Sequence, residues 1–141
     1  MRLRSSTWLP LLALAACSSP APPLPDLDRL DGSAWTVIAL DGTPLLAQIE
    51  ATLRFEAERA SGSGGANRWF SSWKRDGAHL VFGPIGATRS FRDDPKGTMA
   101  QEQRYLAALA ATDGVRLEGR ELVLLAAGVE RVRLALVAPA E

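Results

Sequence analysis

The chain has few of the side chains that most often carry out chemistry. Among its 141 residues there is one cysteine, Cys17, and one histidine, His79. A single cysteine excludes an internal disulfide, and one histidine with one cysteine cannot build the common zinc sites. The 16 basic and 16 acidic residues balance, so the chain has no excess of positive charge of the kind that favours nucleic-acid binding. These shortages predict no enzymatic activity, no metal and no cofactor.

The first sixteen residues have the pattern of a bacterial lipoprotein signal peptide. Arg2 and Arg4 give a positively charged start, and residues 8–16 carry no charge. This run is too short for a permanent transmembrane helix, which needs about 20 apolar residues, but it suits the apolar segment of a signal peptide. The sequence Leu-Ala-Ala-Cys at residues 14–17 resembles a lipobox, in which small residues expose the bond before the cysteine to the peptidase. We therefore expect cleavage after residue 16 and lipidation of Cys17.

Lipidation would hold the mature chain at a membrane. One acyl chain binds a membrane weakly, at about 10⁴ M⁻¹, whereas the three chains (palmitate among them) of a lipoprotein cysteine anchor it stably. Residue 18 is Ser rather than Asp, which by resemblance to sorted lipoproteins favours the outer membrane, with the domain facing the periplasm. Four prolines in residues 20–25 stiffen the chain, so we expect residues 17–29 to be the lipidated cysteine and its tether. Removal of Arg2 and Arg4 leaves 14 basic and 16 acidic residues, a net charge of −2.

Residues 30–138 are expected to form one small domain that is mainly β. Asp-Gly recurs between short apolar runs, and this pair suits hairpin turns because glycine takes a positive φ without a steric penalty. The Asp-Gly pairs lie at residues 31–32, 41–42, 76–77 and 113–114. Several runs alternate: Leu53 and Phe55 alternate with Arg54 and Glu56, and the large apolar residues at 132, 134 and 136 alternate with Arg133 and Ala135. Alternation with a turn about every ten residues predicts an antiparallel sheet, curved or closed into a small barrel.

One segment predicts an amphipathic helix instead. Thr98-Met-Ala-Gln101 fits a capping box, in which the Thr hydroxyl and the Gln amide pair with free backbone N–H groups, and Asp113-Gly114 ends the segment. The side expected to be buried carries Met99, Leu106 and Ala110, with Tyr105 and Leu109 beside them. Such a helix can cover a sheet or plug the mouth of a barrel. The predicted fold class is therefore α+β, mainly β, with one amphipathic helix.

Three segments are the strongest candidates for chemistry. His79 falls at the start of an expected strand, where a solvated residue is favoured over catalysis or metal binding. Asp93-Asp94-Pro95 is the best carboxylate pair, but its proline marks a loop, so a solvated turn is favoured over weak Ca²⁺ binding. The glycine-rich residues 61–68, Ser-Gly-Ser-Gly-Gly-Ala-Asn-Arg, could form a backbone nest for an anion. Since this segment lacks the Lys and Ser/Thr of a P-loop, a bulged strand or a tight crossing where only glycine fits is favoured.

Trp69 and Trp73 form the candidate binding surface. They share one face of an expected strand with Ser71, whereas Phe70 and Lys74 lie on the other face. The core takes one face, and because both faces carry an aromatic residue, we expect at least one ring to be exposed. An exposed tryptophan pair would suggest binding of a glycan or of a partner protein.

Several short motifs occur in order along residues 30–137. They are Leu30-Asp-Gly-Ser-Ala-Trp35, Leu40-Asp-Gly-Thr-Pro44, Leu53-Arg-Phe55, Ala60-Ser-Gly62, Gly65-Ala66-Asn67 with Arg68, Ile85-Gly-Ala-Thr-Arg89, Gln101-Glu102 with Tyr105, Leu106 and Leu109, and Glu121-Leu-Val-Leu124. Together they resemble the META domain, the family of the heat-inducible lipoprotein HslJ. The order and spacing of the motifs, rather than any one of them, carry this resemblance.

The resemblance implies a lipocalin-like antiparallel barrel with a helix, but it does not imply a reaction. The family is associated with envelope stress, drug tolerance, secretion and motility, without an established activity. The residues that match its signature, expected to be structural, are Trp35, Gly65, Asn67, Arg68, Thr88 and Glu102. Relatives often carry a cysteine in Gly-Cys-Asn and a second one after the Thr. Here these positions are Ala66 and, approximately, Arg92, which excludes a thiol or disulfide role.

The function expected from these observations is that of a non-enzymatic bacterial envelope lipoprotein. It would support envelope integrity, or stress and drug tolerance, by contacting an envelope protein partner. The alternative is a binding module, either for a small apolar ligand inside the barrel or as an inhibitor docking on an exoprotein. A barrel interior filled by side chains would argue against the ligand version.

Overall fold

The computed structural model describes residues 24–137. The predicted signal peptide, Cys17 and the first part of the tether lie outside these residues. The described chain contains ten strands, a short 3₁₀ helix at Leu27–Arg29 and one α-helix, α1, at Thr98–Ala111. The strands are β1 (Ala34–Leu40), β2 (Thr43–Pro44), β3 (Thr52–Phe55), β4 (Arg59–Ser63), β5 (Arg68–Asp76), β6 (His79–Phe82), β7 (Gly86–Ala87), β8 (Gly114–Glu118), β9 (Glu121–Ala126) and β10 (Val129–Leu136).

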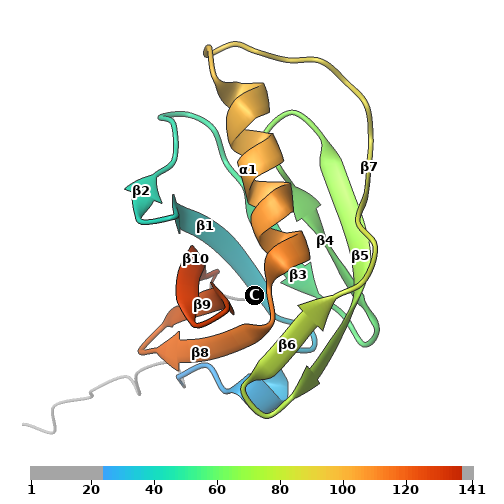
Figure 1. Cartoon of the computed structure of the whole chain (residues 1–141), viewed down its shortest axis with the longest axis vertical. Coiled ribbons are helices and arrows are strands. Elements are labelled where there is room, and N and C mark those ends of the chain that lie inside the picture. Colours follow the sequence, from blue (N-terminus) through green and yellow to red (C-terminus); the bar gives the residue numbers. More distant parts are fainter. Residues whose placement is uncertain (1–23, 138–141) are drawn as a thin grey trace, which may run out of the picture.

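Eight of these strands close into an antiparallel barrel (Figure 1). The order around the barrel is β10-β9-β8-β6-β5-β4-β3-β1, and β1 pairs with β10 to complete the ring. In this closing pair Trp35 lies opposite Leu136 and Val37 opposite Leu134. The short strands β2 and β7 are not among these eight, and they pair with β1 and β5 respectively. The predicted fold class is confirmed, and of its two forms the structure is the small barrel with one helix.

Three of the four Asp-Gly pairs lie in turns, as the sequence predicted. Gly32, Gly42 and Gly77 have positive φ values of 84°, 80° and 58°, a conformation that costs other residues energy. The fourth Asp-Gly pair differs, because Gly114 begins β8 and pairs with His79 of β6. Within residues 24–137 this is the one pair of residues that joins β6 to β8, so Gly114 helps to join the two halves of the barrel.

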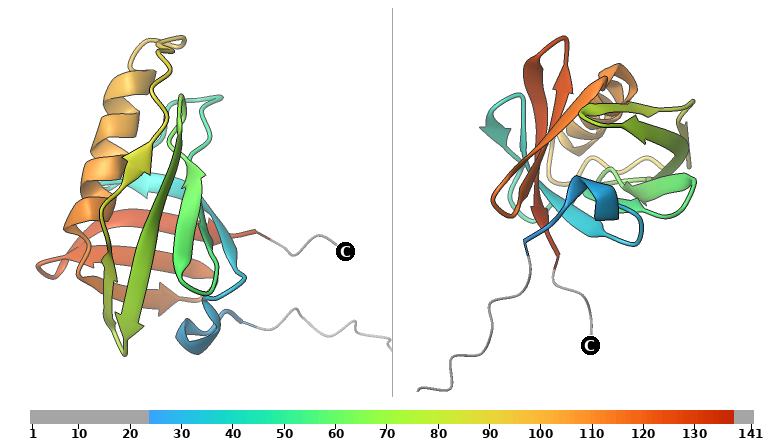
Figure 2. Two further views of the ribbon diagram at one scale, coloured as in Figure 1. Left: turned by 90° about the vertical axis from the view of Figure 1, so that its right-hand side faces the viewer. Right: turned by 90° about the horizontal axis from the view of Figure 1, so that it is seen from below.

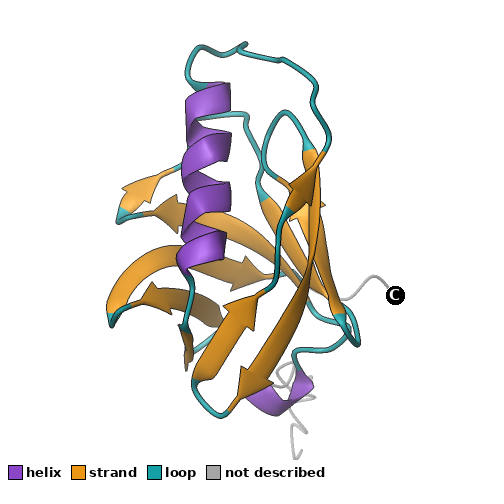
Figure 3. Cartoon of the chain, turned by 45° about the vertical axis from the view of Figure 1, so that its right-hand side comes forward, coloured by secondary structure: helices purple, strands orange, loops and turns teal. Residues whose placement is uncertain are grey.

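The helix α1 lies across the barrel and packs against β6, β9 and β10 (Figures 2 and 3). Its bounds match the predicted segment, but its buried side differs from the expected one. Met99 and Leu106 are only partly buried and Ala110 is exposed. The residues that α1 buries are Thr98, Gln101, Glu102, Tyr105, Ala108 and Leu109. Three of these are polar, and polar side chains at helical spacing normally indicate a solvent face.

The predicted capping box is wrong. Thr98 is the first helical residue rather than the cap, and its hydroxyl donates to the carbonyl of Pro95 at 2.6 Å. The N-cap is Gly97, which has no side chain to offer. Asp93 caps the helix from the preceding loop instead, because its Oδ1 accepts from the backbone N–H groups of Gly97 (3.1 Å) and Met99 (3.2 Å).

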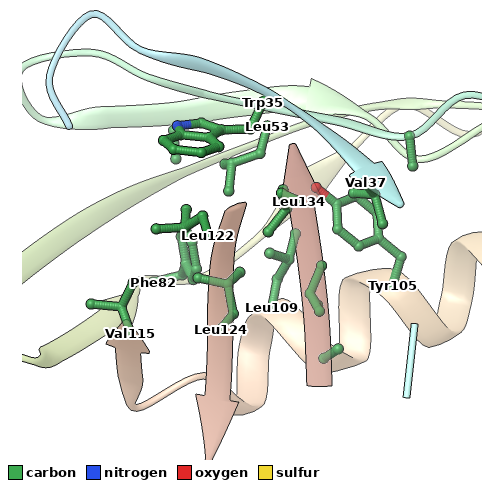
Figure 4. Close-up of a cluster of buried hydrophobic side chains, with 14 of the residues drawn as sticks. Trp35, Val37, Leu53, Phe82, Tyr105, Leu109, Val115, Leu122, Leu124 and Leu134 are labelled. Atoms are coloured by element: carbon green, nitrogen blue, oxygen red, sulfur yellow. The ribbon is translucent and has the colours of Figure 1, made fainter. Parts of the chain in front are cut away.

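Large apolar side chains fill the interior of the barrel (Figure 4). They include Trp35, Leu53, Phe55, Trp69, Leu80, Phe82, Tyr105, Leu109, Leu122, Leu124 and Leu134. The Trp69 ring meets two others edge to face, with its centroid 6.0 Å from that of Tyr105 and 6.3 Å from that of Phe82. Such contacts stabilise a core beyond the burial of their area. Within residues 24–137, no helix is long and apolar enough to cross a membrane.

Candidate functional site

Three polar residues of the expected signature, Asn67, Thr88 and Glu102, meet at one place, where α1 passes the turn between β4 and β5. Glu102 and Asn67 lie 35 positions apart in the sequence, and both are buried, with 3% and 7% of their surface exposed. Glu102 Oε1 accepts from the backbone N–H groups of Asn67 (2.6 Å) and Ala66 (3.1 Å). Its Oε2 accepts from the Asn67 side-chain amide at 2.7 Å. Three N–H groups therefore hold one buried carboxylate.

The glycine-rich turn has the shape that this carboxylate needs. A Cβ added at Gly64 would lie 2.6 Å from Glu102 Cγ, so no larger residue fits there without displacing Glu102. Gly65 has a φ of 122°, which side-chain-bearing residues rarely adopt. The segment does make a tight crossing where only glycine fits, and its backbone N–H groups do face an anion. That anion is the Glu102 side chain of the same chain.

Asn67 also ties down the segment that follows β7. Its Oδ1 accepts from the N–H of Ser90 (2.6 Å) and the hydroxyl of Thr88 (3.0 Å), and its amide also donates to the carbonyl of Ser90 (3.0 Å). The Thr88 hydroxyl in turn accepts from the N–H of Arg68 at 3.2 Å. We call Gly65, Asn67, Thr88 and Glu102 the polar cluster. It joins α1, the β4–β5 turn and the segment after β7.

The chemistry open to the polar cluster is limited by its hydrogen bonds. Both oxygens of Glu102 and both polar atoms of Asn67 are paired with protein groups. A catalytic acid or base must instead reach a proton on a substrate. Hydrogen bonds to a buried charged group contribute about 1.5–3 kcal/mol each, so the geometry suits a role in holding the three segments together.

The other two signature residues lie outside this cluster. Trp35 is buried in the core, and its indole N–H donates to the hydroxyl of Ser33 at 2.8 Å. The side chain of Arg68 is exposed, and its contact with Thr88 is made by the backbone: the Arg68 N–H donates to the Thr88 hydroxyl and the Arg68 carbonyl accepts from the Thr88 N–H at 3.0 Å. The structure thus brings together Gly65, Asn67, Thr88 and Glu102, and it places Trp35 and the Arg68 guanidinium elsewhere.

Two buried contacts of α1 were not predicted from the sequence. The carbonyl of Thr52 accepts from the Tyr105 hydroxyl (2.8 Å) and from the Trp69 indole N–H (3.3 Å). Burial raises the pKa of Tyr105 well above its usual range. Gln101 accepts from the backbone N–H of Leu46 at 2.7 Å. The spacing of Gln101, Glu102 and Tyr105 along one face of the helix could have indicated that this face is buried. Two of the three residues are polar, however, and polar residues normally indicate a solvent face.

The expected surface of Trp69 and Trp73 is not present as a pair. Trp69 is 1% exposed, so its side chain belongs to the core and the prediction is wrong for this residue. Trp73 is partly buried, with its ring 4.8 Å from Phe55 and its indole N–H donating to the carbonyl of Glu56 at 2.7 Å. The exposed ring of this strand is Phe70, 46% exposed, on the opposite face.

An open groove of about 400 Å³ runs over the outer side of β4 and β5, the strands that face the viewer in the left panel of Figure 2. It is lined by Thr52, Arg59, Ser61, Gly62, Ser63, Arg68, Trp69 and Phe70. The guanidinium of Arg59 lies 5.2 Å from the centre of the Phe70 ring, a cation–π contact. None of the lining residues is acidic.

The remaining candidates lie apart from one another. His79 is exposed at the start of β6. Asp93 caps α1, as described above, and Asp94 is exposed beside it. Among residues 24–137, no three His, Cys, Asp or Glu side chains are grouped so that they could hold a metal ion.

The comparisons with known proteins agree with this geometry. The family model of the META domain matches residues 28–138. An NMR structure of a protein from Burkholderia xenovorans superposes with a TM-score of 0.64 at 24% identity, covering 87% of this chain and 97% of that one. A second NMR structure superposes with a TM-score of 0.62 at 18% identity, over 77% of this chain and 92% of the other. At these identities both show the fold alone. No curated protein matches the chain.

Proposed function

The chain belongs to the META domain family, and from this premise we propose that it is a lipid-anchored, non-enzymatic envelope protein of the HslJ-like kind. The observation that carries the proposal is the lipobox at residues 14–17, which ends in the only cysteine of the chain. The acyl chains on Cys17 hold the protein at the outer membrane, and the domain faces the periplasm. There it supports envelope integrity, or tolerance of stress and drugs, through contact with an envelope protein.

The arrangement of the polar cluster supports a role without catalysis. Its carboxylate, which is the buried group most suited to acid–base work, accepts hydrogen bonds from Ala66 and Asn67. The Asn67 amide is bonded in turn to Thr88 and Ser90. A protein whose buried polar groups hold its own segments together fits a scaffold that presents a surface. The contact surface on which the proposal depends therefore belongs to the outer side of the barrel.

The packed interior does not favour the alternative of a small apolar ligand. The rings of Trp35, Phe55, Trp69 and Phe82 occupy the space that such a ligand would need. Ligand pockets in proteins are usually preformed clefts of about 300–1,000 Å³. The groove over β4 and β5 has this size, but its lining includes two arginines and three hydroxyl-bearing residues, which an apolar ligand would leave without partners.

The first experiment tests the anchor. We expect the wild-type chain to incorporate labelled palmitate and to fractionate with the outer membrane, and Cys17→Ser to do neither. A matched variant, Ser18→Asp, keeps the cysteine and is expected to be labelled but retained in the inner membrane. Membrane fractionation of the Cys17→Ser chain as for wild type would refute the anchor.

The second experiment tests the role. A strain that lacks the gene is expected to lose viability under heat, detergent or novobiocin, and the wild-type gene should restore it. The Cys17→Ser gene, expressed at the same level, should restore it poorly because its product is not held at the membrane. If the deletion strain grows like wild type under all three conditions, the envelope role is wrong.

A further inference from the structure

Two arginine side chains, Arg59 and Arg68, line the groove over β4 and β5. Several arginines in residues 24–137 form ion pairs, such as Arg54 with Glu56, Arg75 with Asp28 and Arg131 with Asp41. Within the same described range, the side chains of Arg59 and Arg68 form no ion pair with a carboxylate. The groove is therefore positively charged, although the mature chain as a whole is slightly acidic. Its charge is available for a ligand.

The spacing of the side chains follows from the strand pairing. Arg68 and Phe70 are two residues apart on one face of β5, which places them about 7 Å apart along the strand. Ser61 lies opposite Phe70 and Ser63 opposite Arg68 in the β4–β5 register. The β4 side of the groove therefore carries Arg59 and the two hydroxyl groups, and the β5 side carries Arg68 and the Phe70 ring.

Phe70 is held in place rather than free to move. A Cβ added at Gly86 would lie 2.6 Å from the Phe70 ring, so this ring rests directly on the backbone of β7. The guanidinium of Arg59 lies 5.2 Å from the ring centre. A ring that is fixed in this way and still about half exposed offers a flat apolar surface at low entropic cost.

The same strand pairing excludes the common way of binding an extended peptide. Strands β4 and β5 are paired along Arg59–Ser63 and Arg68–Ser72, so their backbone groups already bond to each other. A peptide that adds to a sheet needs a free strand edge. Recognition in this groove must therefore rely on guanidinium groups, hydroxyls and one flat ring.

We propose that this groove binds a sugar that carries a carboxylate or a phosphate group. The guanidinium of Arg68 or Arg59 bonds to the anion, which it can do with two parallel N–H groups. The flat face of the sugar lies on Phe70, and the Ser61 and Ser63 hydroxyls bond to its hydroxyl groups. This site does not depend on the anchor at Cys17, so its test is independent of the test of the proposed envelope role.

Calorimetric titration of the full chain in detergent micelles tests the proposal. The probes are glucuronic acid and glucose 1-phosphate, with glucose, inorganic phosphate and tetraglutamate as comparison compounds. We expect at least one acidic sugar to bind at least about tenfold more tightly than either glucose or inorganic phosphate, and the acidic sugar that binds more tightly identifies the anion. At least one of Arg59→Gln and Arg68→Gln, the one that removes the guanidinium bonded to the anion, should weaken this binding about tenfold or more, as expected for one lost hydrogen bond to a charged group. If neither variant weakens it, the proposed anion contact is wrong.

Two further variants separate the parts of the site. Phe70→Leu keeps an apolar side chain but removes the flat ring, so it should weaken binding of the acidic sugar and leave weak binding of inorganic phosphate unchanged. Arg104→Gln, at an exposed position on α1, removes the same charge outside the groove and should change nothing. The proposal is overturned if glucose binds as well as the acidic sugars, if phosphate alone binds as tightly, if only tetraglutamate binds, or if no probe binds.

Discussion

At the scale of single residues, the polar cluster shows how much of its role depends on contacts distant in sequence. The glycine-rich turn at residues 61–68 could be predicted to be a tight crossing or an anion nest, because its glycines lack a Cβ. The group that binds to this turn could not be predicted. Nothing near residue 65 indicates that the carboxylate comes from Glu102, which lies on α1, 35 residues beyond Asn67. A glutamate within an amphipathic pattern is normally assigned to the solvent face. Its burial here depends on three N–H groups from another element.

This arrangement predicts a large loss of stability when the carboxylate is altered. Glu102→Gln keeps the shape but turns an amide N–H toward the donors of Asn67, so we expect the free energy of unfolding to fall by about 1–3 kcal/mol. Glu102→Ala leaves all three donors without a partner and should cost more. Denaturant unfolding of the full chain measures both losses.

Gln103→Ala is the matched control, because the side chain of Gln103 is exposed on the same turn of α1. Its effect should stay within about 0.5 kcal/mol. If Glu102→Gln costs no more than Gln103→Ala, then the three hydrogen bonds do not stabilise the fold as described.

At the scale of elements, local patterns predicted where strands and the helix lie better than how their ends are held. The alternation of Leu53 and Phe55 with Arg54 located β3, since alternating side chains point to opposite faces. The helix bounds were also predicted, yet its cap was not. Thr98 and Gln101 have the right types and spacing for a capping box, but the loop before α1 returns Asp93 to the helix end and leaves Thr98 inside the helix.

The cap predicts a measurable effect of Asp93. Asp93→Ala should lower the free energy of unfolding by about 0.5–2 kcal/mol, because the N–H groups of Gly97 and Met99 lose their acceptor. Asp93→Asn retains an acceptor oxygen and loses only the favourable charge at the helix N-terminus, so its cost should be smaller. Amide hydrogen exchange at Gly97 and Met99 should quicken in Asp93→Ala.

Asp94→Ala provides the comparison, since Asp94 is exposed in the same loop. It should leave both stability and exchange nearly unchanged. Equal effects of the two alanine variants would show that loop composition, rather than the Asp93 cap, supports the start of α1.

At the scale of the whole molecule, the closure of the barrel depends on pairings between the ends of the domain. The sequence predicted a sheet that is either curved or closed. In the structure β1 pairs with β10, with Trp35 opposite Leu136 and Val37 opposite Leu134, so the sheet is closed. Such pairs are about a hundred residues apart, and their alternation alone fits several neighbours equally well. Closure and the helix together bury the core in which Tyr105 lies, at 0% exposure, beside Trp69.

Because Tyr105 is buried, we expect the free energy of unfolding to fall as the pH rises into the alkaline range. Tyr105 is the only tyrosine, and desolvation raises its pKa in the folded state well above the value of about 10 that it has in the unfolded chain. Below pH 10 the tyrosine is protonated in both states, so its contribution to stability is fully present. Above pH 10 the unfolded chain loses the proton and the folded chain keeps it, so the free energy of unfolding should fall by about 1.4 kcal/mol per pH unit.

The variant Tyr105→Phe removes this pH dependence, although the lost hydrogen bond to Thr52 lowers its stability at neutral pH. Denaturant unfolding of both proteins from pH 8 to pH 12 should give curves that converge as pH rises, since arginine and lysine titrate alike in the two. Parallel curves would mean that the Tyr105 hydroxyl reaches water in the folded barrel.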